Sequence, residues 1–60
     1  MDMEQIKAQF GVPGFIYTVP AKDAEALPVE GYRIEMDGIF YACVASEVNF
    51  EGWTLVGQSE

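Results

Sequence analysis

The fold of this chain is decided by residues 32–45, which read YRIEMDGIFYACVA. Two runs of β-branched and aromatic residues flank Asp37 and Gly38. This arrangement is typical of a two-residue type I′ β-turn, because both central positions need a positive φ angle, which these two residues tolerate best. We therefore predict a β-hairpin whose strands cover residues 32–36 and 39–45.

The predicted register assigns each hairpin residue to one of two faces, because cross-strand neighbours point to the same side. The face that we expect to lie on the core holds Tyr32, Ile34, Met36, Ile39, Tyr41 and Cys43. The opposite face holds Arg33, Glu35, Phe40, Ala42 and Val44. Either another element covers this mixed face, which we favour, or Phe40 and Val44 form an exposed apolar strip that contacts a partner.

Residues 1–10 are predicted to form an amphipathic helix. Met3, Ile6 and Phe10 recur at helical spacing, with polar residues around the remaining arc. Gly11 is suited to the left-handed conformation that ends many helices. So short a helix is not stable alone, so its apolar stripe must dock on the rest of the chain.

The remaining segments complete the expected elements. Residues 15–19 are aromatic and β-branched, which predicts a strand. Residues 21–27 form either one or two helical turns or a surface loop, since their apolar members are mostly alanines that bury little area. A loop over residues 46–52 leads to a last short strand at 53–56, and the polar residues 57–60 are expected to fray.

The expected architecture is a single α+β domain over residues 1–60. A short N-terminal helix packs on a three- to four-stranded antiparallel sheet, in which the last three strands form a meander. The sheet is either open or curled toward a small SH3-like barrel. A chain of this length buries only about 60% of the surface that its unfolded form exposes, so its stability margin is thin.

The chain is strongly acidic, with a net charge of −7 that comes from ten acidic residues against Lys7, Lys22 and Arg33. Such a surface repels nucleic acid and anionic membranes and favours basic partners. The charge also keeps a small protein in solution, and solubility alone is the simpler interpretation of an acidic surface.

The residue inventory argues against an enzyme. The chain has no histidine, and Cys43 has no imidazole base to activate it, so we interpret Cys43 as a small buried apolar residue. The carboxylates do not follow the spacing of a calcium-binding loop. Asp23, Glu25 and Glu30 share one segment, where a solvated loop is preferred over a weak calcium site. We expect no catalytic residue, no metal and no cofactor.

Cysteine usage and hydropathy bear on the compartment. A lone cysteine excludes an intramolecular disulfide, which is typical of proteins in a reducing cytoplasm. No apolar run approaches the roughly 18 residues of a membrane span, and no basic leader precedes an apolar stretch. We expect a cytoplasmic protein that contacts neither membrane nor nucleic acid directly.

A spaced pattern of glycine, β-branched and aromatic residues runs through residues 31–57. Its members are Gly31, Ile34, Gly38, Tyr41 and Trp53, the last followed by Thr-Leu-Val-Gly. The pattern resembles that of the small chitin-binding carbohydrate modules, in which it marks a hairpin core. The resemblance implies a similar hairpin and, as one alternative function, sugar binding. The chain departs from the family at Tyr32, where the family usually has aspartate, and it lacks the tryptophan pair that stacks on sugar.

The distribution of charge favours a different function. Residues 28–60 hold six acidic residues against Arg33 alone. Such a surface can occupy a groove that evolved for nucleic-acid phosphates, as small phage-encoded inhibitors of the anti-defence or anti-CRISPR type do. We therefore expect a small acidic interaction protein whose partner is a basic surface, such as that of a nucleic-acid-binding protein. The residues expected to make this contact are Glu30, Glu35, Asp37, Glu47 and Glu51.

Two alternatives stay open. The chain could be a small structural subunit of a larger assembly such as a phage particle, with Phe40 and Val44 as apolar contacts, or a carbohydrate-binding module. Trp53 is either a large contribution to the core, which we favour and which requires a partner for its indole nitrogen, or an exposed ligand platform.

Overall fold

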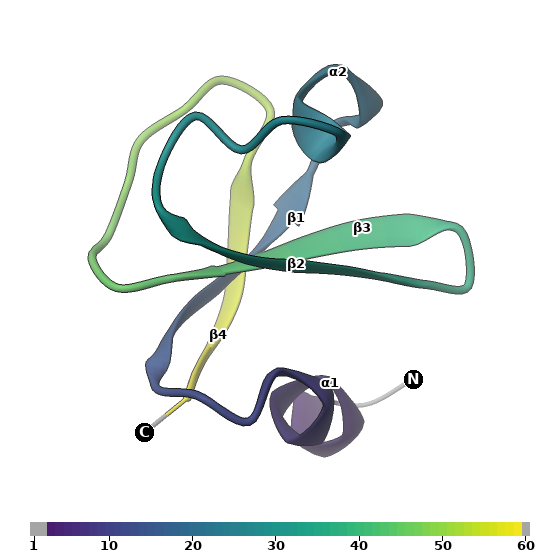
Figure 1. Cartoon of the computed structure of the whole chain (residues 1–60), viewed down its shortest axis with the longest axis vertical. Helices are drawn as coiled ribbons and strands as arrows, with labels where there is room; N and C mark the ends of the chain where they lie inside the picture. Colours follow the sequence, from purple (N-terminus) through teal and green to yellow (C-terminus); the bar gives the residue numbers. More distant parts are fainter. Residues whose placement is uncertain (1–2, 60) are drawn as a thin grey trace.

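The structure is a computed structural model that describes residues 3–59 and contains one four-stranded antiparallel sheet (Figure 1). Its elements are α1 (Met3–Phe10), β1 (Gly14–Val19), α2 (Ala21–Ala24), β2 (Gly31–Met36), β3 (Ile39–Val44) and β4 (Thr54–Ser59). The strand order is β2-β3-β1-β4, and α1 and α2 lie on opposite sides of the sheet. The expected α+β fold, with a short N-terminal helix on an antiparallel sheet, is confirmed.

The predicted hairpin is confirmed in its turn and its register. Asp37 and Gly38 have φ angles of 55° and 78°, so both occupy the left-handed region that a type I′ turn requires. Across the two strands, Tyr32 pairs with Cys43, and the pairing continues regularly to the turn. The hairpin is therefore specified by local sequence alone.

The predicted meander is wrong in its last step, because β4 pairs with β1 and not with β3. Residues 45–53 cross one face of the sheet and deliver β4 to the free edge of β1 (Figure 1). Ile16 of β1 consequently lies between Cys43 and Gly57. The sheet is open, with β2 and β4 as its edges, and it does not close into a barrel. Residues 57–59, which were expected to fray, belong to β4.

α1 covers one face of the sheet through the predicted apolar stripe. Its buried residues Ile6 and Phe10 belong to a cluster that also holds Ile16, Tyr41 and Cys43, with Met3 packed against it. Gly11 ends the helix with a φ angle of 65°, and its N–H donates to the carbonyl of Lys7 at 2.9 Å. Residues 1 and 2 of the predicted helix lie outside the described residues.

Two residues expected on this core face are instead exposed. Tyr32 keeps 61% of its surface accessible and Ile39 keeps 47%. They lie at opposite ends of the hairpin, whose six-residue strands are about 20 Å long. The α1 cluster packs against Ile34 and Met36 of the hairpin and leaves Tyr32 and Ile39 accessible.

The second face of the sheet is covered by loops. Its cluster of buried residues consists of Tyr17, Val19, Ala42, Val44 and Trp53. The segments before and after the hairpin cover this cluster with Leu27, Val29, Val48 and Phe50. The interpretation that another element covers the mixed face is therefore correct, with Val44 buried and Phe40 half-buried.

The hydroxyl of Tyr17 fixes one of these covering loops. It donates to the carbonyl of Val48 at 3.2 Å and accepts from the N–H of the same residue at 3.1 Å. One buried side chain thus satisfies both backbone groups of a residue that has no strand partner of its own. The contact holds residues 45–53 against the sheet.

We expect Tyr17→Phe to lower the free energy of unfolding by about 1–3 kcal/mol, because it leaves the backbone groups of Val48 without their partner. Urea denaturation followed by circular dichroism measures the loss. Tyr32→Phe is the matched control: it removes a hydroxyl from an exposed tyrosine, and we expect a change within about 0.5 kcal/mol. Equal losses in the two variants would contradict the role of the Tyr17 hydroxyl.

Candidate functional site

The five acidic residues predicted to contact a partner all lie at the surface. They are Glu30, Glu35, Asp37, Glu47 and Glu51. Glu30 and Glu47 lie near one end of the hairpin, because Gly31 pairs with Val44 at that end. Asp37 lies in the turn at the other end, about 20 Å away along the strands (Figure 1). The carboxylates are therefore spread along the hairpin and do not form one compact patch.

Glu35 lies on the loop-covered face, where Arg33 is its neighbour two residues away on the same strand. Beside them is a shallow depression of about 300 Å³, lined also by Glu25 of the segment after α2 and by Phe40. Phe40 is thus partly accessible in the depression, whereas the two other predicted apolar contacts, Val44 and Trp53, lie in the core.

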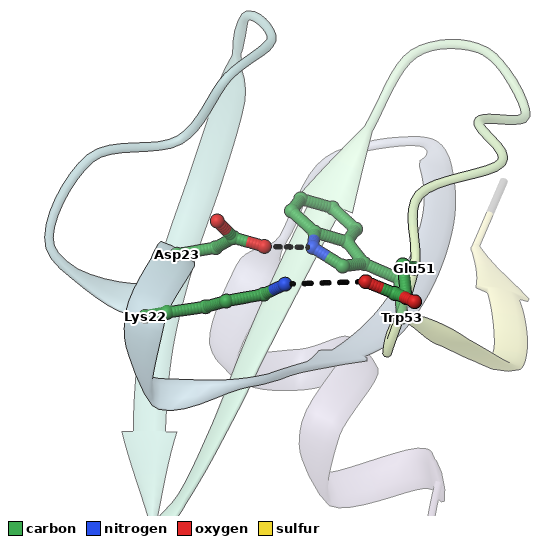
Figure 2. A network of polar contacts seen from close by, with 4 residues as sticks. All are labelled: Lys22, Asp23, Glu51 and Trp53. Atoms are coloured by element: carbon green, nitrogen blue, oxygen red, sulfur yellow. Dashed lines mark hydrogen bonds and ion pairs between the residues drawn. The ribbon is translucent and has the colours of Figure 1, made fainter.

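Glu51 lies opposite Lys22 of α2, and its carboxylate oxygen Oε1 is 3.7 Å from the Lys22 ammonium (Figure 2). Both side chains are largely exposed, so the pair contributes little to stability and is screened by salt. This is the single ion pair within residues 3–59. The remaining exposed carboxylates of that part of the chain carry uncompensated charge.

Trp53 is a core residue held by a polar contact. Its indole Nε1–H donates to Oδ2 of Asp23 at 2.8 Å (Figure 2). The ring packs against Tyr17 and Phe50, with centroid distances of 5.9 Å and 5.1 Å. The sequence indicated that the indole needed a partner but did not identify Asp23. That carboxylate belongs to α2, so residues 21–24 form a helical turn, whereas residues 25–27 are not helical.

Cys43 lies on the α1 side of β3, where it is buried. Its Sγ is 3.9 Å from the carbonyl oxygens of Val12 and Pro13, which are weak acceptors for the thiol. Burial raises the pKa of the Cys43 thiol above its ordinary value of 9.0, because the thiolate would be poorly solvated there. Near neutral pH the thiol is therefore protonated and a poor nucleophile.

A groove of about 570 Å³ lies at the end of the hairpin where β2 begins, and we call it the end groove. Its lining residues are Pro13, Leu27, Val29, Glu30, Gly31, Tyr32, Cys43 and Ala45. Sequence reasoning did not find it, because Tyr32 was expected in the core and because the lining comes from separate segments. The signal in the sequence that could have indicated the groove is Tyr32 itself, an aromatic residue at the very start of a predicted hairpin strand.

Residues 3–59 hold no group of three or more cysteine and carboxylate side chains that could bind a metal ion. Neither helix in that range is long and apolar enough to cross a membrane. Comparisons with protein-family models, with curated proteins and with solved structures found no match to this chain.

Proposed function

We propose that this chain is a small non-enzymatic interaction protein that binds a basic protein surface through its exposed carboxylates. Its partner on this proposal is a nucleic-acid-binding protein whose phosphate-binding site it occupies as an inhibitor, of the kind that phages encode against host defences. The observation that carries the proposal is the accessibility of Glu30, Glu35, Asp37 and Glu47, which have no cation paired with them among residues 3–59.

The spread of the carboxylates supports a groove-shaped partner. Glu30 and Glu47 lie near one end of the hairpin and Asp37 in the turn at the other end, so a partner must extend along the hairpin to contact all three. A groove lined with lysine and arginine would contact both ends together. Because the net charge is −7, the field of the whole domain also increases the rate of encounter with such a partner.

The alternative function as a subunit of a larger assembly is supported by β4. This edge strand carries no charged residue, and Leu55 and Val56 on it are exposed. Charged residues are a common means of protecting an edge strand from pairing with other chains, so β4 is open to such pairing. The carbohydrate alternative has less support, because Trp53 is buried and does not present its ring for stacking.

The test compares wild type with a variant in which Glu30, Glu35, Asp37, Glu47 and Glu51 are all replaced by lysine. Each is used as bait in a host extract at low and at high salt, and the affinity for the recovered partner is then measured. We expect the variant to bind at least about 100-fold more weakly, because like charges placed opposite each other cost several kcal/mol. Four of these residues are exposed outside the turn, so their replacement should hardly change the thermal stability. Asp37 has a φ angle of 55°, which lysine tolerates less well, so the single variant Asp37→Lys measures the stability that is lost at the turn.

The matched control replaces Glu4 and Glu25, two exposed carboxylates outside the proposed set, by lysine. This control should retain most of the affinity. Wild-type binding should also weaken strongly as the salt concentration rises, because salt screens exposed charges. Tight binding that survives the five substitutions, or that holds at high salt, would overturn the proposal and favour apolar assembly through β4.

A further inference from the structure

We propose that the end groove binds an arginine side chain of the basic partner, with the guanidinium stacked on Tyr32 and paired with Glu30. This inference rests on the proposed function, and it assigns one specific contact to it. The end groove combines three features that recognise such a side chain: an exposed aromatic ring, a single carboxylate and apolar walls.

Tyr32 supplies the aromatic surface. Its side chain is 61% accessible, and among residues 3–59 it has no hydrogen bond and no ring contact that would occupy it. A cation over the face of a tyrosine ring is attracted by the quadrupole of the ring. Arginine is favoured over lysine at such a position, because the guanidinium is planar and less strongly hydrated than an ammonium group.

Glu30 supplies the charge. It is the only charged residue in the lining of the end groove, it is exposed, and no cation pairs with it in the described part of the chain. A carboxylate can accept two parallel hydrogen bonds from one guanidinium, a geometry that adds specificity as well as strength. An anionic ligand would meet both this carboxylate and the net charge of −7.

The apolar walls match the stem of an arginine. Leu27, Val29 and Pro13 supply apolar lining to the end groove from two separate segments of the chain. Arginine buries its three methylene groups against apolar surface while the charged end pairs elsewhere. A volume of about 570 Å³ is within the range of small-ligand sites, so the side chain can enter together with part of its backbone.

The test is an NMR titration of the labelled protein at low salt with a capped peptide of alternating glycine and arginine. Two comparison peptides replace arginine by lysine or by neutral citrulline. We expect the amide signals of residues 29–32 and 43–45 to shift with the arginine peptide, to shift less with lysine and not to shift with citrulline. Tyr32→Ala should weaken binding about fivefold, since it removes a cation–π contact of roughly 1 kcal/mol.

Three further variants distinguish binding in the end groove from non-specific electrostatic attraction to the acidic surface. Tyr32→Phe keeps the ring and should bind like wild type. Glu30→Gln should weaken binding about fivefold, because the guanidinium loses its ionic partner. Glu47→Gln removes the same charge at a nearby position outside the lining and should weaken binding less than about twofold, as expected for a screened surface charge.

Unchanged binding by Tyr32→Ala, or equal effects of Glu30→Gln and Glu47→Gln, would overturn the inference. In that case the proposed function could still hold, because loss of the partner by the five-lysine variant would then reflect diffuse charge. A shift of the same amide signals by a chitin oligosaccharide, without a response to the arginine peptide, would also overturn it. That result would assign the end groove to sugar.

Discussion

We expect Trp53→Ala to leave a large fraction of the molecules unfolded at 25 °C. Only 9% of the surface of Trp53 is exposed, and its ring packs on Tyr17 and Phe50 beneath the covering loops. Truncating a buried tryptophan costs about 3–5 kcal/mol. A single core in a domain of this size supplies about 3–5 kcal/mol in total, so the variant loses most of its stability.

Circular dichroism under urea is the measurement, because Trp53 is the only tryptophan and its fluorescence is lost with it. Leu55→Ala is the control, since it truncates an apolar residue of β4 that is 47% exposed, and we expect it to cost about 0.5 kcal/mol or less. Asp23→Ala removes only the acceptor of the indole N–H and should cost about 1–3 kcal/mol. A urea midpoint near that of wild type for Trp53→Ala would contradict this account of the loop-covered face.

Ile16→Ala is expected to lower the free energy of unfolding by about 2–5 kcal/mol. Ile16 has 0% exposure on the central strand β1, and it belongs to the cluster on which α1 docks through Ile6 and Phe10. The substitution leaves a cavity between sheet and helix that the neighbouring strands cannot fill without moving. Since α1 is too short to be stable alone, its amide hydrogens should also exchange faster.

Ile39→Ala is the matched control, because it makes the same chemical change on the same face of the sheet at a residue that is 47% exposed. We expect a loss of no more than about 0.5 kcal/mol. Ile16→Val should lie between the two, at about 0.5–1.5 kcal/mol. Losses of similar size at positions 16 and 39 would show that α1 does not define the core on this face.

The sequence predicted those parts of the fold that depend on neighbouring residues. Asp37 and Gly38 specify the hairpin turn because few residues tolerate two consecutive positive φ angles, and the register then follows by alternation. The helix was also predictable, since its apolar spacing and the glycine after Phe10 are both local signals.

The parts that were missed depend on contacts between distant segments. Residues 54–59 carry no local signal for pairing with β1, and consecutive strands are adjacent in most sheets, so a meander was expected. The exposure of Tyr32 depends on which part of the hairpin α1 packs against, which no single segment encodes. The acidic surface could be predicted because it follows from composition alone. The end groove could not, because it joins residues near positions 13, 30 and 44, which are distant in the sequence.

The central position of β1 constrains the order in which the strands can assemble during folding. The β2–β3 hairpin joins neighbouring residues and can form within about 1–10 μs. β1 has no such local partner: Ile16 pairs with Cys43 on one side and with Gly57 on the other. Both pairings require closure of long loops before any contact compensates the lost entropy. Folding is therefore expected to be limited by the docking of β1 between a preformed hairpin and the final strand, on the slower timescale of sheets with high contact order.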